Sequence, residues 1–596
     1  MTLKSIINSS ILLLLISIAG VAQSPPASQQ KKDTEEVEKK EAVEKKALLM
    51  VDEIIKEIAS LKLPDNRIRL LALTADVLWE KDEKRARVLF KQAINEFAVI
   101  TEASRPRLAD PVKESQAFMI IQSHWQLRQE VLQIIARRSP SLARDFLRVT
   151  KFSFPQAEQY YNEAQWELNL ASQVVTSEPR QALEIAEENL EKELSQELVS
   201  LYFKLKEKDG EAAEKLLNGI MKKLRAADLS ASYGSAGVAL LLLQTGIHPE
   251  AKAQPALDER IIRELIDLLA AAALREGDDS LDSNNGYDGD GRPTLLMQLQ
   301  SIMGDVEKYA PARATALKKR IGELSKRIRP EQKALQELEE AMVSGDVETM
   351  VKAADKSPEE YREKIYQQAI QKAMEDGDTD RARQIISEHI SEPRRTALLT
   401  DVDRRSIWLE AERGKLGEVK HRLSEVLPEE RAGLLAQTAA AAIGKADKKA
   451  VIELLEEARS LLGAQAANAS EFHTLLDIAR NYARVDPVKS FEIIEPAVDH
   501  LNTLIAAASV LDGFEYGRNF REGELISQGT SILFGLVFQC AKDTAELARA
   551  DFDRAKAVAD RFQRNEVRLM ARLYVAQGVL AAKLPATASV GQRMSY

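Results

Sequence analysis

The sequence predicts an all-α protein, a right-handed α-solenoid of antiparallel helix pairs with no substantial β-sheet. Three observations predict this fold class. First, the 596 residues include only 26 Gly and 19 Pro and are rich in Ala, Leu, Glu and Lys, a composition that favours helix over sheet. Second, from about residue 50 onward the apolar residues recur with helical period, and no run alternates with period two. Third, a longer period of about 35 residues lies above the helical one.

The first 22 residues have the pattern of a secretory signal peptide. Lys4 supplies a positive charge, Ile11 to Ala19 form a short apolar stretch, and Gly20 and Ala22 are small residues suited to cleavage. The alternative is a membrane-anchoring helix, but the apolar stretch is too short to span a bilayer comfortably. We therefore expect cleavage and export to the periplasm or the extracellular space. No later segment has 18 uninterrupted apolar residues, so we expect no integral membrane segment after cleavage.

The net charge and the cysteine content limit which partners and which cysteine chemistry we expect. The formal net charge of −10 argues against a surface that follows nucleic-acid phosphates, so no nucleic-acid partner is expected. The one cysteine, Cys540, allows no intramolecular disulfide and lies in an apolar run, which predicts a small buried hydrophobic residue. A lipid anchor at the cleavage site would need a cysteine there, and none is present.

Residues 23–46 are predicted to be a polar and charged spacer that leads into the first helix. The pairs Glu36–Lys40 and Glu41–Lys45 have Glu four residues ahead of Lys, the orientation that supports an exposed helix. A first array of helical repeats is then predicted over residues 47–274.

The longer period is clearest in helices that begin with a small residue, followed three and four positions later by large apolar ones. One such face contains Ala86, Leu89, Phe90, Ala93, Ile94 and Phe97; a second contains Ala213, Leu216, Leu217, Ile220, Met221 and Leu224. A small side chain lets a partner helix approach closely, and the large ones fill the groove beside it.

Weaker copies of this pattern recur in both halves of the chain. Their first residues are Ala143, Ala182, Met350, Ala382, Val419, Val451, Ser490 and Ala555. From Met350 to Ser490 the successive steps are 32, 37, 32 and 39 residues, which suffices for two helices of three to four turns and two short turns. Turn signals fall at the expected reversals, at Asp209-Gly210, Gly345-Asp346, Gly377-Asp378 and Asp486-Pro487.

The two-helix unit of about 35 residues resembles the tetratricopeptide repeat class, in a degenerate form. The segment Ala75-Asp76-Val77-Leu78-Trp79, followed by Ala86 and Phe90, carries the resemblance, and HEAT-like helix pairs are a close neighbour. The resemblance extends over roughly residues 48 to 583. It implies binding of a protein or peptide in a concave groove, and it implies no catalysis.

Residues 275–293 interrupt the pattern with an acidic, glycine-rich loop. Its oxygen-bearing side chains are of the type that calcium prefers, and they make candidate ligands of Asp282, Asn284, Asp288 and Asp290. In the helix-loop-helix calcium pattern, Gly286 and Met297 stand where two ligands are required, so a solvated loop is the main interpretation. The loop would separate the first array from a second one at 294–583, followed by a flexible tail at 584–596.

No pattern of a catalytic site is found in the sequence. The six histidines are scattered, with no HExxH, and His389 and His473 lie on faces that read as apolar, as expected of structural histidines. No phosphate-binding loop and no GxSxG motif is present. The four tryptophans, Trp79, Trp125, Trp166 and Trp408, are expected to pack between helices.

The sequence therefore favours a non-enzymatic, exported scaffold of the bacterial cell envelope that binds protein or peptide partners and needs no cofactor. Two alternatives stay open: the helical part of a secreted, peptidoglycan-processing enzyme, and a calcium-dependent adhesion or assembly protein. Thermal stability with calcium and with chelator tests the last of these, because a folded-state ligand raises the melting temperature. An unchanged melting temperature would remove it.

Overall fold

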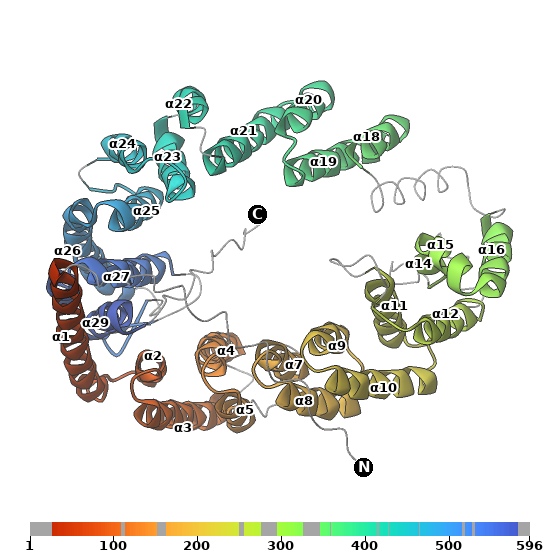
Figure 1. Ribbon diagram of the computed structural model, residues 1–596, viewed down its shortest axis with the longest axis horizontal. Helices are drawn as coiled ribbons and strands as arrows, with labels where there is room; N and C mark the ends of the chain where they lie inside the picture. Colours follow the sequence, from red (N-terminus) through yellow and green to blue (C-terminus); the bar gives the residue numbers. More distant parts are fainter. Residues whose placement is uncertain are drawn as a thin grey trace, which may run out of the picture.

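The protein is an all-α solenoid whose helices lie along a ring-shaped path (Figure 1). This confirms the predicted fold class, while the handedness stays a prediction. The computed structural model describes residues 27–108, 114–151, 163–248, 256–275, 295–325, 346–357, 359–413, 416–426, 428–463, 465–514, 519–526 and 531–581. Within these ranges the only strands are β1 (Phe520–Arg521) and β2 (Glu524–Leu525), which form one antiparallel hairpin.

The N-terminal half begins with α1 (Ala27–Ile58) and continues as helix pairs. One helix of each pair lies on the inner edge of the ring: α2 (Pro64–Leu78), α4 (Glu114–Ala136), α7 (Glu163–Val174), α9 (Gln196–Lys208) and α11 (Tyr233–Ile247). Their partners lie outside: α3 (Glu83–Leu108), α5 (Pro140–Val149), α8 (Pro179–Lys192), α10 (Gly210–Ala226) and α12 (Glu259–Ala273). Three further helices pack on α12: α14 (Leu295–Ser301), α15 (Met303–Tyr309) and α16 (Pro311–Ser325).

The C-terminal half repeats the arrangement. It starts with α18 (Val347–Lys356), α19 (Glu359–Glu375), α20 (Thr379–His389) and α21 (Arg394–Glu412). The inner helices that follow are α23 (Pro428–Ala442), α25 (Ala469–Val485) and α27 (Ile532–Ala550), with α22 (Leu416–Glu425), α24 (Lys448–Ser460) and α26 (Pro487–Asp512) outside them. The described helices end with α28 (Phe552–Asp560) and α29 (Asn565–Leu580).

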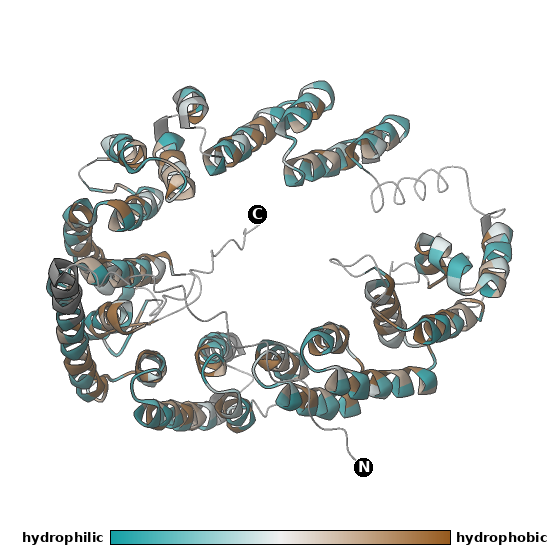
Figure 2. Cartoon of the chain, viewed as in Figure 1, coloured by the Kyte–Doolittle hydropathy of each residue, from teal (hydrophilic) through white to brown (hydrophobic). Residues whose placement is uncertain are grey.

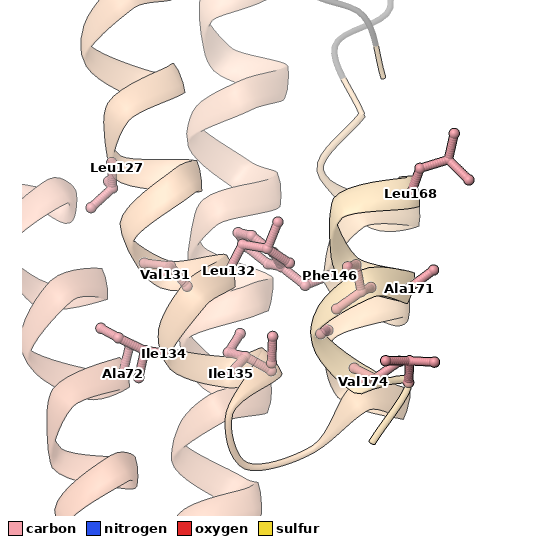
Figure 3. Packing of buried hydrophobic residues seen from close by; sticks show 14 of the residues in the cluster. Ala72, Leu127, Val131, Leu132, Ile134, Ile135, Phe146, Leu168, Ala171 and Val174 are labelled. Atoms are coloured by element: carbon pink, nitrogen blue, oxygen red, sulfur yellow. The ribbon is translucent and has the colours of Figure 1, made fainter. Parts of the chain in front are cut away.

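The apolar faces predicted from the sequence form the core between neighbouring helices. The face that starts at Ala86 is buried along α3, and the head of every weaker copy, from Ala143 to Ala555, is buried in a helix. Figure 2 shows the resulting division, in which hydrophobic stretches alternate with hydrophilic ones around each helix. Figure 3 shows one layer of this core, where Ile135 of α4, Phe146 of α5 and Ala171 of α7 lie between adjacent helices.

The predicted turn signals begin helices. Asp209, Asp346 and Asp378 each accept a hydrogen bond from the backbone N–H three residues later, which satisfies one of the free donors at a helix start. Gly377, just ahead of Asp378, has φ +79°, a conformation that glycine adopts without steric cost. Asp486 also precedes a helix, α26, whose first residue is Pro487.

A buried arginine connects three helices of the N-terminal half through hydrogen bonds and an ion pair. Arg128 of α4 is 2% exposed and donates to Thr150 Oγ1 at 2.9 Å and to the carbonyl oxygen of Leu147 at 3.0 Å, both at the end of α5. Its two terminal nitrogens also form a bidentate pair with Glu163 of α7, at 2.8 and 3.0 Å. Bidentate arginine–carboxylate pairs combine strength with fixed geometry, so this side chain sets the spacing of α4, α5 and α7.

The buried core is continuous through the two ends of the described chain. One apolar cluster contains residues from Ala47 to Leu317 and from Ile407 to Leu580, and a smaller one contains residues from Met350 to Val402. The larger cluster is joined where α1 and α2 pack on α29, which brings the first and last described helices together (Figure 1). The stack of pairs therefore closes on itself, an arrangement that the repeat pattern did not predict.

We expect Gly578→Ala to lower the free energy of unfolding by about 1–3 kcal/mol through overpacking. A Cβ at Gly578 of α29 would lie 2.0 Å from the backbone oxygen of Ala545 in α27, so the two helices must separate. Urea titration measures the loss. Gly535→Ala in α27 is the control, because a Cβ there meets nothing within 4 Å. Equal effects of the two substitutions would contradict the close approach.

Candidate functional site

The closure seam, defined as the contact of α1 and α2 with α29 and the β1–β2 hairpin, is where residues distant in sequence come together. The hairpin turn consists of Glu522 and Gly523, which have φ 53° and φ 84°. Positive φ at both central residues gives a turn whose twist matches that of the two strands. The hairpin is thereby held in a shape that presents Glu524 to the start of α2.

Glu524 is buried and joins the two ends of the chain. Its carboxylate accepts hydrogen bonds from the backbone N–H groups of Lys62 and Leu63, at 2.6 and 3.2 Å, and from Nδ2 of Asn66 at 3.1 Å. Leu63 is the residue that precedes α2, so a side chain from more than 450 positions away satisfies free donors at this helix start. Asn66 also donates to the carbonyl oxygen of Leu525 at 3.1 Å.

Ion pairs flank this hydrogen-bonded centre of the seam. Lys46 of α1 pairs with Asp553 at 2.7 Å, and Arg572 of α29 pairs with Glu57 of α1 at 3.2 Å. Lys46 and Asp553 are both more than half exposed, and an exposed pair contributes less than about 1 kcal/mol. The apolar packing and the buried Glu524 contacts therefore hold the seam together.

A cavity of about 710 Å³, which we call the closure cavity, opens beside the seam. Five helices from both halves line it: α2 and α4, the end of α7, α27 and α29. Its polar lining consists of Asp76, Glu130, Gln133, Arg137, Gln173, Ser177, Lys542, Tyr574 and Gln577; Leu73, Ile134, Ala136 and Phe538 complete the wall. Its volume is typical of sites that bind small molecules or a short stretch of a larger partner.

The two acidic groups of the closure cavity are neutralised by neighbouring arginines. Arg138 donates to Asp76 Oδ1 at 2.6 Å, and Arg69 donates from Nε to both carboxylate oxygens of Glu130 at 2.9 Å. The two basic groups, Arg137 and Lys542, have no carboxylate within ion-pair distance among the described residues. The two charged side chains of the cavity that have no ion-pair partner in the described part of the chain are therefore both positive, in a protein of negative net charge.

A buried charge cluster lies behind Lys542. Arg480 of α25 donates from Nε and Nη2 to the two carboxylate oxygens of Asp543 at 2.8 and 3.2 Å, and from Nη1 to Asp477 at 3.0 Å. Desolvation raises the pKa of Asp543 to about 6 and also raises the pKa of Asp477, while Arg480 opposes both shifts. Desolvation lowers the pKa of Lys542.

We expect the raised pKa of Asp543 to make the stability of the protein depend on pH. Its pKa of about 6 in the folded state exceeds the ordinary 3.8, so between these values the folded state holds a proton that the unfolded state releases. The contribution of this group is therefore fully present below about pH 4 and is lost as the pH rises through 6. We expect the slope of unfolding free energy against pH, from 4 to 6.5, to be less negative in Asp543→Asn than in the parent protein. Asp380→Asn, on a 90% exposed side chain, should leave the slope unchanged. Equal slopes in the Asp543 variant and the parent would contradict the assignment.

A second hollow, of about 500 Å³, lies among α20, α21, α22 and α23. Three arginines line it, but each already has a partner: Arg383 pairs with Asp403 at 2.5 Å, Arg404 pairs with Glu430 at 2.6 Å, and Arg422 donates to Ser406 Oγ at 2.6 Å. Because these groups are engaged within the protein, the closure cavity is the better candidate site.

The structure tests several residues that the sequence analysis singled out. Cys540 is buried, as predicted, and burial raises the pKa of its thiol. His389 stacks on Tyr366 with ring centroids 4.1 Å apart, as expected of a structural histidine. The expectation that His473 lies on an apolar face was wrong, because its side chain is exposed; its ring is nevertheless hydrogen-bonded within the protein, with Nδ1 3.0 Å from Gln539 Oε1.

The tryptophan expectation holds for all but one of the four residues. Trp125 and Trp166 pack edge to face at 4.8 Å, and Trp79 contacts Phe90 at 5.8 Å. Trp408, by contrast, is 36% exposed, with the guanidinium of Arg405 over its ring. The prediction that Trp408 packs between helices was therefore wrong.

Other predicted features lie outside the described residues. These are the signal peptide at 1–22, the calcium candidates Asp282, Asn284, Asp288 and Asp290, and the tail at 584–596. Among the described residues, no group of three or more His, Cys, Asp or Glu side chains is placed to hold a metal ion. Within the same ranges, no helix is both long and apolar enough to cross a membrane.

The fold and the cavity define the class of protein, an all-α protein of stacked helical repeats. No protein-family model matches the chain, and no curated protein matches it. Among solved structures, it is similar to a "circular tandem repeat protein with novel repeat topology and enhanced subunit contact surfaces". The match has 17% identity, covers 90% of this chain and 98% of the other, and has a TM-score of 0.15, too low to carry an argument.

Proposed function

We propose that this protein is a non-enzymatic, exported scaffold of the bacterial cell envelope, with tetratricopeptide-like repeats that bind a protein or peptide on the inner surface of the ring. The observation that carries the proposal is the closure cavity, a concave site lined by inner helices from both ends of the chain. Stacked helix pairs gain an extended concave surface from the same packing that buries their core. Export rests on the signal-peptide pattern of residues 1–22.

Binding on the inner surface can be tested by site-specific cross-linking. A photoreactive amino acid is placed at Gln173 of the cavity, at Gln577 of the cavity, or at Lys222 on the outer helix α10. Each purified protein is mixed with envelope extract, irradiated and analysed for cross-linked partners. We expect the two cavity positions to capture the same protein or peptide and Lys222 to capture none. Capture at Lys222 alone would contradict binding at the inner surface.

The alternative that the protein is an enzyme can be tested with the same purified protein. The proposal expects no hydrolysis of purified envelope glycans by the protein. Hydrolysis that survives repurification and is lost on substitution of residues in the closure cavity would replace the scaffold with an enzyme.

A further inference from the structure

We propose that the closure cavity binds a small amphipathic organic anion, with its acidic group between Arg137 and Lys542 and its apolar part against Phe538. This goes beyond the scaffold role, because it assigns a small-molecule ligand to the junction of the two chain ends. Three features of the cavity support this: two unpaired cations, several polar groups without a partner among the described residues, and an apolar wall.

Four charged side chains line the cavity: two acids and two bases. Asp76 and Glu130 are already paired with arginines, so neither attracts a ligand cation strongly. Nε of Arg137 donates to the carbonyl oxygen of Gln133 at 3.2 Å, which leaves its terminal nitrogens available. Asp543, which follows Lys542 in the sequence, is held by Arg480 through two hydrogen bonds. An oxyanion is therefore the group that both free cations would stabilise.

Tyr574 offers a hydroxyl group to a ligand in the cavity. Its side chain is only 6% exposed and lines the cavity, yet no described residue hydrogen-bonds its hydroxyl. This hydroxyl can therefore donate to, or accept from, a ligand in the cavity. Gln133, Gln173 and Gln577 add side-chain amides, likewise without a partner among the described residues, that can donate or accept.

The apolar wall completes the site. Phe538 of α27, Leu73 of α2 and Ile134 of α4 line the cavity together with its polar groups. Small-molecule sites typically combine such apolar walls with a few polar groups that fix the orientation of the ligand. Because α2 and α4 come from one end of the chain and α27 and α29 from the other, a bound ligand contacts both sides of the seam. Binding should therefore raise the melting temperature of the whole ring.

The test uses the full chain and 8-anilino-1-naphthalenesulfonate, an aromatic anion whose fluorescence rises in apolar sites. Dodecanoate, dodecyl phosphate, dodecanol and dodecyltrimethylammonium compete for it, each below its micelle concentration. We expect both anions to displace the dye and to raise the melting temperature, with the neutral and cationic compounds at least about tenfold weaker. The ratio of the two anions shows whether a carboxylate or a phosphate is the better acidic group.

The double variant Arg137→Gln/Lys542→Gln separates the proposal from non-specific binding. Both side chains are exposed, so the variant should fold, which circular dichroism checks. We expect it to bind the anions at least about tenfold more weakly and dodecanol unchanged. The matched control, Lys84→Gln/Lys222→Gln, removes the same charge from outer helices. Equal displacement by dodecanol, undiminished anion binding by the first variant, or no dye binding at all would overturn the proposal. None of these outcomes bears on capture of a protein partner.

Discussion

Replacing Arg128 by Met should lower the free energy of unfolding by about 3–5 kcal/mol, the cost of breaking a buried ion pair by removing one partner. The substitution leaves the Glu163 carboxylate, whose side chain is only 17% exposed, without its bidentate partner. The carbonyl oxygen of Leu147 and the hydroxyl of Thr150 also lose a donor. Equilibrium unfolding in urea, followed by circular dichroism, measures the effect.

Two further variants make the Arg128 prediction specific. Arg148→Met removes an arginine that is 78% exposed and paired with Asp145, so it should change stability by less than about 0.5 kcal/mol. Arg128→Met combined with Glu163→Gln removes the unpaired charge and should recover part of the loss. A loss below about 1 kcal/mol for Arg128→Met alone would show that α4, α5 and α7 are held by their apolar contacts.

Glu524→Ala should cost about 2–4 kcal/mol and loosen the closure seam. The backbone N–H groups of Lys62 and Leu63 lose their acceptor, and Asn66 loses one of its two acceptors; an unsatisfied buried donor costs about 1–3 kcal/mol. Urea unfolding measures the total, and amide hydrogen exchange at Lys62 and Leu63 reports on the seam itself. We expect exchange at these two amides to accelerate more than exchange at amides in α10.

Two control variants make the Glu524 prediction specific. Glu524→Gln keeps one carbonyl acceptor and should fall between the parent protein and Glu524→Ala. Glu259→Ala, in an exposed pair with Arg263 on α12, should leave both stability and seam exchange nearly unchanged. If Glu524→Ala exchanges at Lys62 and Leu63 at the parent rate, the carboxylate does not hold the two ends together.

Local features of the sequence were sufficient to predict the repeating elements. The face that begins at Ala86 could be predicted because helical spacing alone places its residues on one side of a helix. Asp209 and Asp346 could be predicted as helix starts because a capping side chain acts within three residues. His473 and Trp408 were misplaced because a periodic pattern does not fix how far a face is covered by the next helix.

The candidate site could not be predicted in the same way. The sequence predicted a calcium site only where candidate ligands lie close together along the chain, at Asp282, Asn284, Asp288 and Asp290. The closure cavity instead combines Arg137 with Lys542, and the seam combines Asn66 with Glu524, each pair separated by hundreds of positions. Neither the spacing nor the composition around these residues marks them. The Glu522-Gly523 turn is a local signal that could have revealed the hairpin, but not its partner.

The helices, their pairing and the all-α fold class could be predicted from the sequence, because they depend on side-chain periodicity and on caps within a few residues. The tertiary structure alone decided that α1 and α2 meet α29, that Glu524 caps a helix at the other end of the chain, and that two cations are left unpaired in one cavity. Each helix pair is rotated slightly relative to the one before it, and these rotations add up along the stack. Their sum, rather than any one repeat, determines whether the two ends of the stack meet.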